Sequence, residues 1–394
     1  MLERRLRLLQ FSNTMARGGA EEHILTLLRG LDRDCFALHL VCTPTVATAL
    51  RGDVPSDVEV VPFLGRPGDV PAALRFARLL RARRVDILHS HLFYSSLFAS
   101  PVGRFCRVPV VMETPHIREH WRHGPIKGHF FIDRLVGRCV DHYIAVGDAN
   151  GRHLVDGKGL PRRKIRVIHN GCDLERFQPG KVSPHRLRAR LGFHDTDLIM
   201  VVVGRLEPQK GHRVLLEALP TVVQQHPRAR LVCVGEGALR DELEAEAERR
   251  GLSSVVRFVG YQDNVPEWMA LADVFVLPSL FEGLPLVVIE ALAAERAVVA
   301  TAVDGTPEII VDGRTGLTVP PGDARALAVA LDRVLRDPEL RGRLAQAGRQ
   351  WVLERFTQES QVRKTQELYL EAWDRGRQQR STALDVATAS ERNT

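Results

Sequence analysis

Short apolar runs alternate with longer amphipathic segments along the chain, and the alternation begins again in the second half. The runs that predict strands are residues 6–12, 37–42, 58–62, 85–89, 108–113 and 142–146, then 198–204, 230–234, 255–259, 273–277, 297–301 and 315–319. The segments with apolar positions at helical spacing are residues 20–31 and 71–83, then 214–226, 239–249, 323–336 and 358–373. Strands that alternate with helices in this way predict doubly wound parallel sheets of the α/β class.

A break in both periodicities divides the chain. Residues 178–184, Gln-Pro-Gly-Lys-Val-Ser-Pro, favour neither strand nor helix, and 394 residues exceed the size at which a single core usually keeps growing. We therefore expect two Rossmann-like domains, residues 1–178 and 179–355, that face each other across an interdomain cleft. Residues 356–375 are expected to form a helix that packs back on the first domain, and the polar tail 376–394 is expected to be disordered.

Composition narrows the class of protein without identifying it. Hydrophobic residues make up 44% and charged residues 26% of the chain, which is typical of a soluble globular protein. No window approaches the roughly 20 apolar residues of a membrane span, and the N-terminus has no signal-peptide pattern. The six cysteines have no Cys-x-x-Cys spacing, so neither a zinc site nor a disulfide framework is indicated, and a reducing cytoplasm fits best.

The net charge of +7 is distributed unevenly. Residues 1–178 contain 27 Lys and Arg against 18 Asp and Glu, a net +9, whereas the remaining residues carry 28 against 30, a net −2. The excess suggests an anionic partner such as a membrane surface or a phosphorylated carrier, although a solvated arginine-rich face explains it equally well. Aromatic residues do not interleave with these arginines, which argues against a nucleic-acid partner.

Two glutamates lie where a ligand would meet the second domain. Glu282 follows the buried strand at 273–277 on a loop, and Glu290 lies inside the helix that begins near Pro285. Ligands of open α/β sheets bind at the carboxyl ends of the strands, so the two carboxylates could hold hydroxyl groups of one ligand. Taken alone, the pair is better explained as a partner for the helix macrodipole and a residue of a solvated helix face.

Cations and glycines follow two other strands of the second domain. Arg205 and Lys210 lie in Gly-Arg-Leu-Glu-Pro-Gln-Lys-Gly, and a planar guanidinium beside an ammonium group suits a diphosphate. A proline-initiated turn with solvated charges explains the same segment about as well. Gly235 and Gly237 could line a nucleotide pocket or form only a tight turn.

The first domain offers a glycine pair and three histidines after its strands. Gly18 and Gly19 open the first helix, where backbone amides attract phosphate, but the Gly-x-Gly-x-x-Gly and P-loop patterns are both absent. His116 could hydrogen-bond a sugar or share a developing charge. His89 and His91 have the spacing of a metal pair, yet no further ligand set accompanies them, so we expect no metal site.

Taken in order, these segments resemble the group 1, family 4 retaining glycosyltransferases, which have the GT-B fold of two Rossmann-like domains. The most specific match is Glu282-x7-Glu290 within Pro-Ser-Leu-Phe-Glu-Gly-Leu-Pro-Leu-Val-Val-Ile-Glu-Ala. Supporting matches are Arg-Gly-Gly-Ala-Glu (17–21), Asp-Ile-Leu-His-Ser-His (86–91), Asn-Gly-Cys-Asp-Leu-Glu-Arg-Phe-Gln-Pro (170–179), Gly-Arg-Leu-Glu-Pro-Gln-Lys-Gly (204–211) and Asp-Gly-x-x-Gly-Leu (312–317).

The resemblance implies transfer of a sugar from a nucleotide-diphosphate donor to a glycan, lipid-linked or small-molecule acceptor, with retention at the anomeric carbon and without a cofactor or bound metal. It implies that Arg205 and Lys210 bind the diphosphate, that Glu282 holds the donor sugar and that Glu290 holds the ribose. His116 would lie near the transferred sugar, and with Glu282, Arg205 and Lys210 it completes the expected catalytic set. The other residues of the expected donor site are Gly18, Gly19, Gly235, Gly237, Gly283 and Leu284.

One turn departs from the family pattern, because Glu295 and Ala297 stand where Gly and Pro are common. This departure puts the local turn geometry in doubt more than the activity.

Two alternatives to a glycosyltransferase stay open. A nucleotide-sugar 2-epimerase of the same fold would act on the donor alone, and a non-catalytic nucleotide-sugar binding protein would transfer nothing. The sequence gives neither the donor base nor the sugar nor the acceptor.

Overall fold

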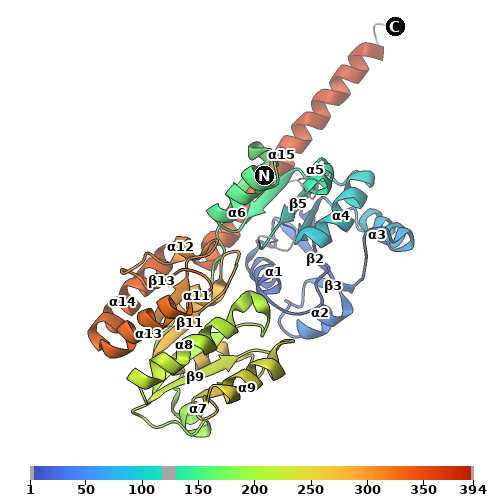
Figure 1. Cartoon of the computed structure of the whole chain (residues 1–394). Helices are drawn as coiled ribbons and strands as arrows, with labels where there is room; N and C mark the ends of the chain where they lie inside the picture. Colours follow the sequence, from blue (N-terminus) through green and yellow to red (C-terminus); the bar gives the residue numbers. More distant parts are fainter. Residues whose placement is uncertain (1–3, 118–129, 392–394) are drawn as a thin grey trace. The chain divides into compact units, whose positions relative to one another are not determined.

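The computed structural model describes residues 4–117 and 130–391, and it describes side chains up to residue 378. The chain folds into two compact units. Residues 1–169 together with 359–394 form the first unit, and residues 170–358 form the second. Each unit is built around one parallel sheet, which can be followed by its strand labels in Figure 1.

The sheet of the first unit has seven parallel strands in the order β3-β2-β1-β4-β5-β6-β7. These strands are β1 (Leu6–Ser12), β2 (Phe36–Cys42), β3 (Glu59–Pro62), β4 (Ile87–His91), β5 (Val110–Thr114), β6 (His142–Ala145) and β7 (Ile165–Val167). The main helices are α1 (Gly19–Gly30), α2 (Pro44–Ala49), α3 (Val70–Ala82), α4 (Phe93–Phe105), α5 (Phe131–Val136), α6 (Asp148–Arg152) and α15 (Gln358–Glu391).

Both faces of this sheet are buried, and the apolar side chains of β1 are divided between them. Leu6 and Leu8 pack in a cluster with residues of α1 and α15, whereas Leu9 and Phe11 pack in a second cluster with residues of α3 and α4. Since successive side chains of a strand point to opposite faces, the two clusters lie on opposite sides of β1.

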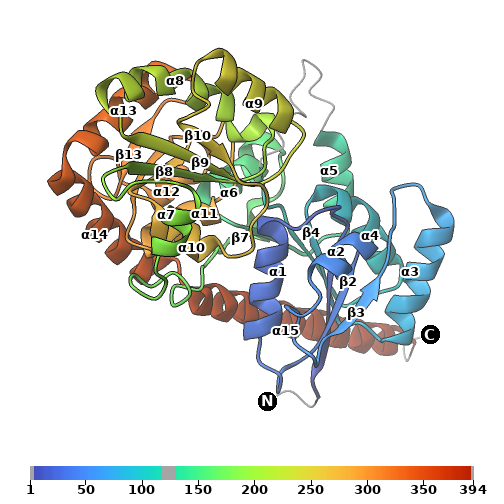
Figure 2. The same cartoon turned by 90° about the horizontal axis from the view of Figure 1, so that it is seen from below.

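The second unit contains six parallel strands in the order β10-β9-β8-β11-β12-β13. They are β8 (Leu198–Val203), β9 (Ala229–Val234), β10 (Val256–Phe258), β11 (Val274–Leu277), β12 (Ala297–Thr301) and β13 (Leu317–Val319). Helices α8 (His212–Gln225), α9 (Arg240–Arg249) and α13 (Ala324–Arg336) cover one face of the sheet, and α10 (Val265–Leu271) and α11 (Leu286–Ala293) cover the other (Figure 2). The remaining helices are α7 (His185–Arg190), α12 (Thr306–Ile309) and α14 (Pro338–Arg355).

The predicted class of doubly wound parallel sheets is confirmed, and each expected strand segment overlaps a strand of the structure. The sequence did not predict β7, a three-residue edge strand with an arginine at its centre. It also did not predict α4, a helix that carries Pro101 in its interior. None of the described helices combines enough length with enough apolar character to cross a bilayer.

The units divide after His169, nine residues before the boundary that we expected at 178/179. Residues 170–178 belong to the second unit because Cys172 joins its C-terminal end. Cys172 N donates to Phe356 O at 2.9 Å, and Gln358 N donates to Cys172 O at 3.2 Å. The Pro- and Gly-rich segment 178–184 is therefore a loop inside the second unit rather than the linker.

The last helix belongs to the first unit although it follows the second in the sequence. Val362, Leu368, Tyr369 and Ala372 of α15 are buried in the core cluster beside β1 and α1, as expected for residues 356–375. The helix continues to Glu391, and its C-terminal turns extend beyond the other elements of this unit in Figure 1. The expected disordered tail from residue 376 thus differs from the structure, because residues 377–391 contain neither Gly nor Pro to end the helix.

The departure at Glu295 does not change the course of the chain after α11. Glu295 has a φ of +57°, the left-handed conformation that favours glycine. Arg296 N donates to Ala291 O at 2.9 Å and Glu295 N donates to Leu292 O at 3.0 Å, which is the hydrogen-bond pattern of a Schellman motif. The turn therefore has the geometry that a glycine would give it, and the glutamate holds it at a conformational cost.

Replacing Glu295 with glycine is expected to stabilise the second unit. The substitution removes the left-handed penalty and retains both backbone hydrogen bonds, so the free energy of unfolding should rise by about 0.5–1 kcal/mol. Urea unfolding combined with hydrogen exchange of residues 170–358 measures the change. Glu295→Ala is the matched control, because it removes the carboxylate that lies 4.0 Å from Arg349 while keeping the strained conformation. Equal stability of the two variants would contradict the prediction.

Candidate active site

The expected donor-site residues of the second unit lie on loops that follow β8, β9 and β11. Strand β8 pairs with both β9 and β11, so the chain order reverses at β8 and leaves a crevice beyond the carboxyl ends of the strands. This topological switch point is where open α/β sheets bind ligands. The loop 204–211 after β8 and the loop 278–285 after β11 both start there.

These two loops contact each other through their backbones. Leu280 N donates to Gln209 O at 2.7 Å, and Gln209 Nε2 donates to Phe281 O at 3.0 Å. Gly211 has a φ of +65°, and a Cβ atom added there would lie 2.0 Å from Pro278 O. Only glycine therefore allows this approach, which brings the side chains of both loops together.

The result of this approach is a salt bridge between Lys210 and Glu282. Lys210 Nζ lies 2.6 Å from Glu282 Oε1, and the exposed fractions of the two side chains are 15% and 6%. Ser279 Oγ donates to the same carboxylate oxygen at 2.6 Å, and the backbone N–H of Glu282 donates to Asp304 at 2.8 Å. Glu282 Oε2 accepts no hydrogen bond from the described part of the chain. Lys210 and Glu282, which lie in separate sequence motifs, therefore form one ion pair in the structure.

Arg205 lies on the same loop as Lys210 but in solvent. Within the described ranges, the guanidinium makes one hydrogen bond, from Nη2 to Gln209 Oε1 at 3.3 Å, and the residue is exposed. A long cationic side chain with one weak tether can reorient at little cost. The edge of the second sheet therefore carries one fixed cation, Lys210, and one adjustable cation, Arg205.

Gly235 and Gly237 have a structural reason to be glycine. A Cβ atom at Gly235 would lie 2.0 Å from Gly204 O, and one at Gly237 would lie 2.4 Å from Leu206 O. The loop after β9 thus packs backbone to backbone against the loop after β8, with Leu206 N donating to Glu236 O at 2.9 Å. This packing supports the loop that carries Arg205 and Lys210, whatever further contact these glycines make.

The remaining expected donor residues of the second unit follow Glu282 in the sequence and are buried to different degrees. Gly283 is buried, and its carbonyl accepts a hydrogen bond from Gly305 N at 2.9 Å. Leu284 is only 4% exposed, so its side chain serves the packing of the loop. Glu290 is the fifth residue of α11, about one turn into the helix, and is half-buried.

In the first unit, His89, His91 and His116 gather at the carboxyl ends of β4 and β5, which are adjacent strands. His91 Nδ1 lies 3.0 Å from His116 Nε2. Burial lowers the pKa of all three imidazoles well below the ordinary value, so they are neutral at physiological pH. Sequence reasoning placed these residues at strand ends, but it did not predict that their rings would touch.

Neither His89 nor His91 is disposed to hold a metal ion. The two nitrogens of His89 lie at hydrogen-bond distance from Tyr369 and Thr114, and those of His91 from Gln10 and His116. Each lone pair that could serve a metal is thus engaged within the protein.

Glu21 is a site residue that sequence reasoning missed. Its buried carboxylate accepts hydrogen bonds from Gly18 N at 3.0 Å, from Ser12 Oγ at 3.2 Å and from Thr14 Oγ1. Burial raises the pKa of this carboxyl, and the three donors oppose the rise. These bonds fold the loop after β1, so that Gly18 and Gly19 are exposed at the start of α1. A Glu three residues after a helix N-cap was the available signal.

Comparison with known proteins identifies the class of protein that this fold and site define. Residues 185–351 match the family described as Glycosyl transferases group 1, and residues 17–176 match Glycosyltransferase Family 4. The putative glycosyltransferase EpsD of Bacillus subtilis is 30% identical over 77% of this chain and 81% of its own length. Glycogen synthase of Mycobacterium tuberculosis is 32% identical over 80% of this chain and 76% of its own length.

The protein is therefore a glycosyltransferase, and it belongs to family 4 of the group 1 enzymes. A solved structure, Anabaena HepE in complex with UDP-glucose, superimposes with a TM-score of 0.83 at 20% identity and covers 93% of this chain and all of its own. That likeness establishes the GT-B fold of two Rossmann-like domains. The family predicted from the ordered sequence motifs is confirmed.

Gly211→Ala is expected to disrupt the contact between the loops after β8 and β11. The added methyl group clashes with Pro278 O and occupies a left-handed conformation, so unfolding of the second unit should become easier by about 3 kcal/mol or more. Gly180→Ala is the matched control, because Gly180 has a φ of +79° and no atom lies within 4 Å of the place that its new methyl group would take, so it should cost only about 1 kcal/mol. Urea unfolding of both variants measures the difference, and equal losses would refute the role of the close approach.

Proposed function

We propose that this glycosyltransferase uses a nucleotide-diphosphate sugar as donor and transfers the sugar with retention at the anomeric carbon. The second unit binds the donor, and the first unit provides the acceptor side, with His116 near the transferred sugar and Gly18 and Gly19 at the donor. The acceptor is a glycan, a lipid-linked saccharide or a small molecule. The observation that carries the proposal is the salt bridge between Lys210 and Glu282 at the switch point of the second sheet.

The cations at the carboxyl edge of the second sheet suit the diphosphate of such a donor. Lys210 and Arg205 are cations at this sheet edge, and together they can neutralise a diphosphate. The leaving group gains negative charge as the glycosidic bond breaks, so fixed cations lower the barrier without a resident metal ion. We assign this role to Lys210, which is already held in place, and to Arg205, which can fold onto the ligand.

Glu282 can hold the sugar because only one of its oxygens is committed. Lys210 and Ser279 both bond Oε1, which leaves Oε2 to accept a hydroxyl of the donor sugar. The shared carboxylate then fixes the distance between sugar and diphosphate, because one cation–anion pair contacts both parts. Glu290 is assigned to the ribose hydroxyls. This division of labour positions the reacting carbon, and orientation of this kind supplies a large part of enzymatic rate enhancement.

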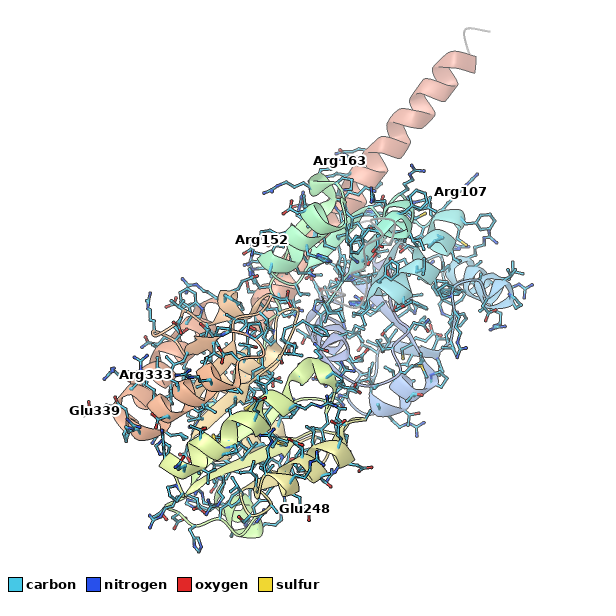
Figure 3. The ribbon with its side chains drawn as sticks, in the orientation of Figure 1. Arg107, Arg152, Arg163, Glu248, Arg333 and Glu339 are labelled. Carbon is cyan, nitrogen blue, oxygen red and sulfur yellow. The ribbon has the colours of Figure 1, made fainter. Side chains whose placement is uncertain are left out.

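Glu282→Gln is expected to lower turnover by a factor of about 100 or more while the fold survives. The amide retains the size of the side chain and can still accept from Ser279, but it loses the charge that pairs with Lys210. Turnover is measured with the donor selected from UDP-, GDP- and ADP-sugars by thermal shift. Glu248→Gln is the matched control, because Glu248 points away from the second unit in Figure 3.

Full turnover by the Glu282→Gln enzyme would overturn the assignment of Glu282 to the donor sugar.

Incubation with donor alone separates transfer from epimerisation, because an epimerised sugar would appear without any acceptor. The anomeric configuration of the product, read by NMR, tests retention separately. A nucleotide sugar that binds with no transfer across an acceptor panel would instead support a binding protein.

We also propose that the enzyme acts in the cytoplasm and touches an anionic membrane face through the first unit. The short helix α5 exposes Phe131 by 65%, Ile132 by 48% and Leu135 by 50%, with Arg134 exposed among them. Exposed apolar side chains beside an arginine suit the interface of anionic lipids. The outward-pointing Arg107, Arg152 and Arg163 of the same unit, labelled in Figure 3, add to its positive surface.

A double substitution, Ile132→Glu with Leu135→Glu, is expected to weaken sedimentation with phosphatidylglycerol vesicles roughly tenfold, because it replaces apolar insertion with charge repulsion. Val329→Glu is the matched control, since Val329 is 63% exposed on α13 of the second unit. Wild-type protein should not sediment with phosphatidylcholine vesicles. Binding that is equal for both lipids, or unchanged in the double variant, would contradict the proposed contact.

A further inference from the structure

A buried chain of hydrogen bonds in the first unit connects His116 with the C-terminal helix. Gln10 Nε2 lies 3.1 Å from Tyr369 Oη, and Gln10 Oε1 lies 2.7 Å from His91 Nε2. His91 Nδ1 lies 3.0 Å from His116 Nε2. Gln10, His91 and Tyr369 are completely buried, whereas His116 is 7% exposed at the end of the chain of bonds. The chain therefore runs from the core to a group that we assign to the ligand.

The chain continues on the other side of the tyrosine. Tyr369 Oη lies 2.6 Å from His89 Nδ1, and His89 Nε2 lies 2.7 Å from Thr114 Oγ1. Burial lowers the pKa of the histidines and raises the pKa of Tyr369, so the imidazoles are neutral and the phenol keeps its proton. Each neutral imidazole then has one donating and one accepting nitrogen.

Two arrangements of the protons satisfy every bond in this chain. In the first, Gln10 donates to Tyr369, which donates to His89, and Gln10 accepts from His91. In the second, the amide of Gln10 is turned over and every proton in the chain moves to the opposite partner. The two arrangements differ at His116, because its Nε2 donates to His91 in the first and accepts from it in the second.

The distances select the first arrangement. A separation of 2.6 Å between Tyr369 Oη and His89 Nδ1 is typical of an O–H donor and short for an N–H donor, so the phenol donates. Its lone pairs then accept from the amide nitrogen of Gln10 at 3.1 Å, an ordinary N–H···O distance. Gln10 Oε1 must therefore accept from His91 Nε2, and His91 Nδ1 carries no proton.

We propose that Gln10 and Tyr369 are positioning residues that fix the tautomer of His116, with the proton on Nε2 and a lone pair on Nδ1. His116 donates its only proton to His91. Its Nδ1 is consequently an obligatory acceptor. This inference rests on the proposed function, because the group that would donate a hydrogen bond to His116 Nδ1 is a hydroxyl of the bound sugar.

The surroundings hold the rings in this arrangement. Leu92, which follows His91, has φ +69° and ψ 152°, a strained conformation that persists only where the structure around it is firmly packed. The ring of His23 meets those of His116 and His91 edge-on, with centroids 4.8 and 5.5 Å apart. His23 is itself bonded at Nδ1 by Gln361 of α15, at 2.9 Å. The C-terminal helix thus supports the cluster at two points.

Tyr369→Phe tests the proposal directly. Without Oη, the buried amide nitrogen of Gln10 loses its acceptor, and turning the amide over leaves an unsatisfied carbonyl oxygen instead, which costs less. The protons of His91 and His116 should then move to Nδ1. Long-range ¹⁵N–¹H NMR of the full-length, ¹⁵N-histidine-labelled protein reads the tautomer without substrate, and His116→Asn assigns the signal by its disappearance.

Kinetics provide the second measurement. Tyr369→Phe should lower kcat roughly 3- to 10-fold, the effect of one neutral hydrogen bond, and should cause no further loss in a His116→Ala background. Thr365→Val is the matched control on the same helix, because it removes a buried hydroxyl that donates only to the backbone oxygen of Gln361. It should change neither the tautomer nor kcat.

Three outcomes would overturn the proposal: a proton on His116 Nδ1 in the wild type, an unchanged tautomer in Tyr369→Phe, or equal kinetic losses with and without His116. The NMR result is independent of any transfer assay. If the tautomer is as proposed and His116→Ala retains full activity, the role of His116 in the proposed function fails while the positioning by Gln10 and Tyr369 stands.

Discussion

The backbone contact between the loops after β8 and β11 is the constraint on which the donor half of the site depends. Parallel pairing places the ends of both strands at one edge, but pairing alone leaves the loops free to diverge. Gly211 removes the side chain that would keep them apart, and Gly235 does the same between the loops after β8 and β9. The buried Lys210–Glu282 pair follows from this closeness, because a carboxylate with 6% exposure needs its cation fixed beside it.

The fold was largely predictable because its signals are local and repeated. Buried parallel strands such as β8 and β12 are continuous apolar runs, and the helices between them have one apolar face. The elements that escaped prediction lack these signals. In β7 an arginine interrupts a three-residue edge strand, and in α4 a proline lies inside a helix that is buried on several sides. The boundary moved because a Pro- and Gly-rich loop resembles a linker in sequence, whereas the backbone bonds of Cys172 to the end of α14 are not local.

The sequence named candidate residues for the site but did not show how they pair. Motif order identified Glu282, Lys210 and His116, since each follows a strand at the ligand-binding edge. It could not show that Lys210 bonds Glu282, nor that Gln10 and Tyr369, which are 359 residues apart in the sequence, bond each other. Such contacts depend on tertiary packing. At Glu295 the sequence left the turn geometry open, and the structure shows that a left-handed glutamate keeps the helix C-cap.

The chain leaves the first unit at residue 169 and returns to it only at residue 359. During synthesis from the N-terminus, the strands of the first unit therefore emerge long before Val362, Leu368, Tyr369 and Ala372, which complete its core. Until then, Gln10 and His89 each lack the bond to Tyr369, and a polar group left partly unsatisfied in a core is costly. The second unit, whose residues 170–358 are contiguous, can close first. The first unit can therefore complete its core only after the whole of the second unit has been synthesised.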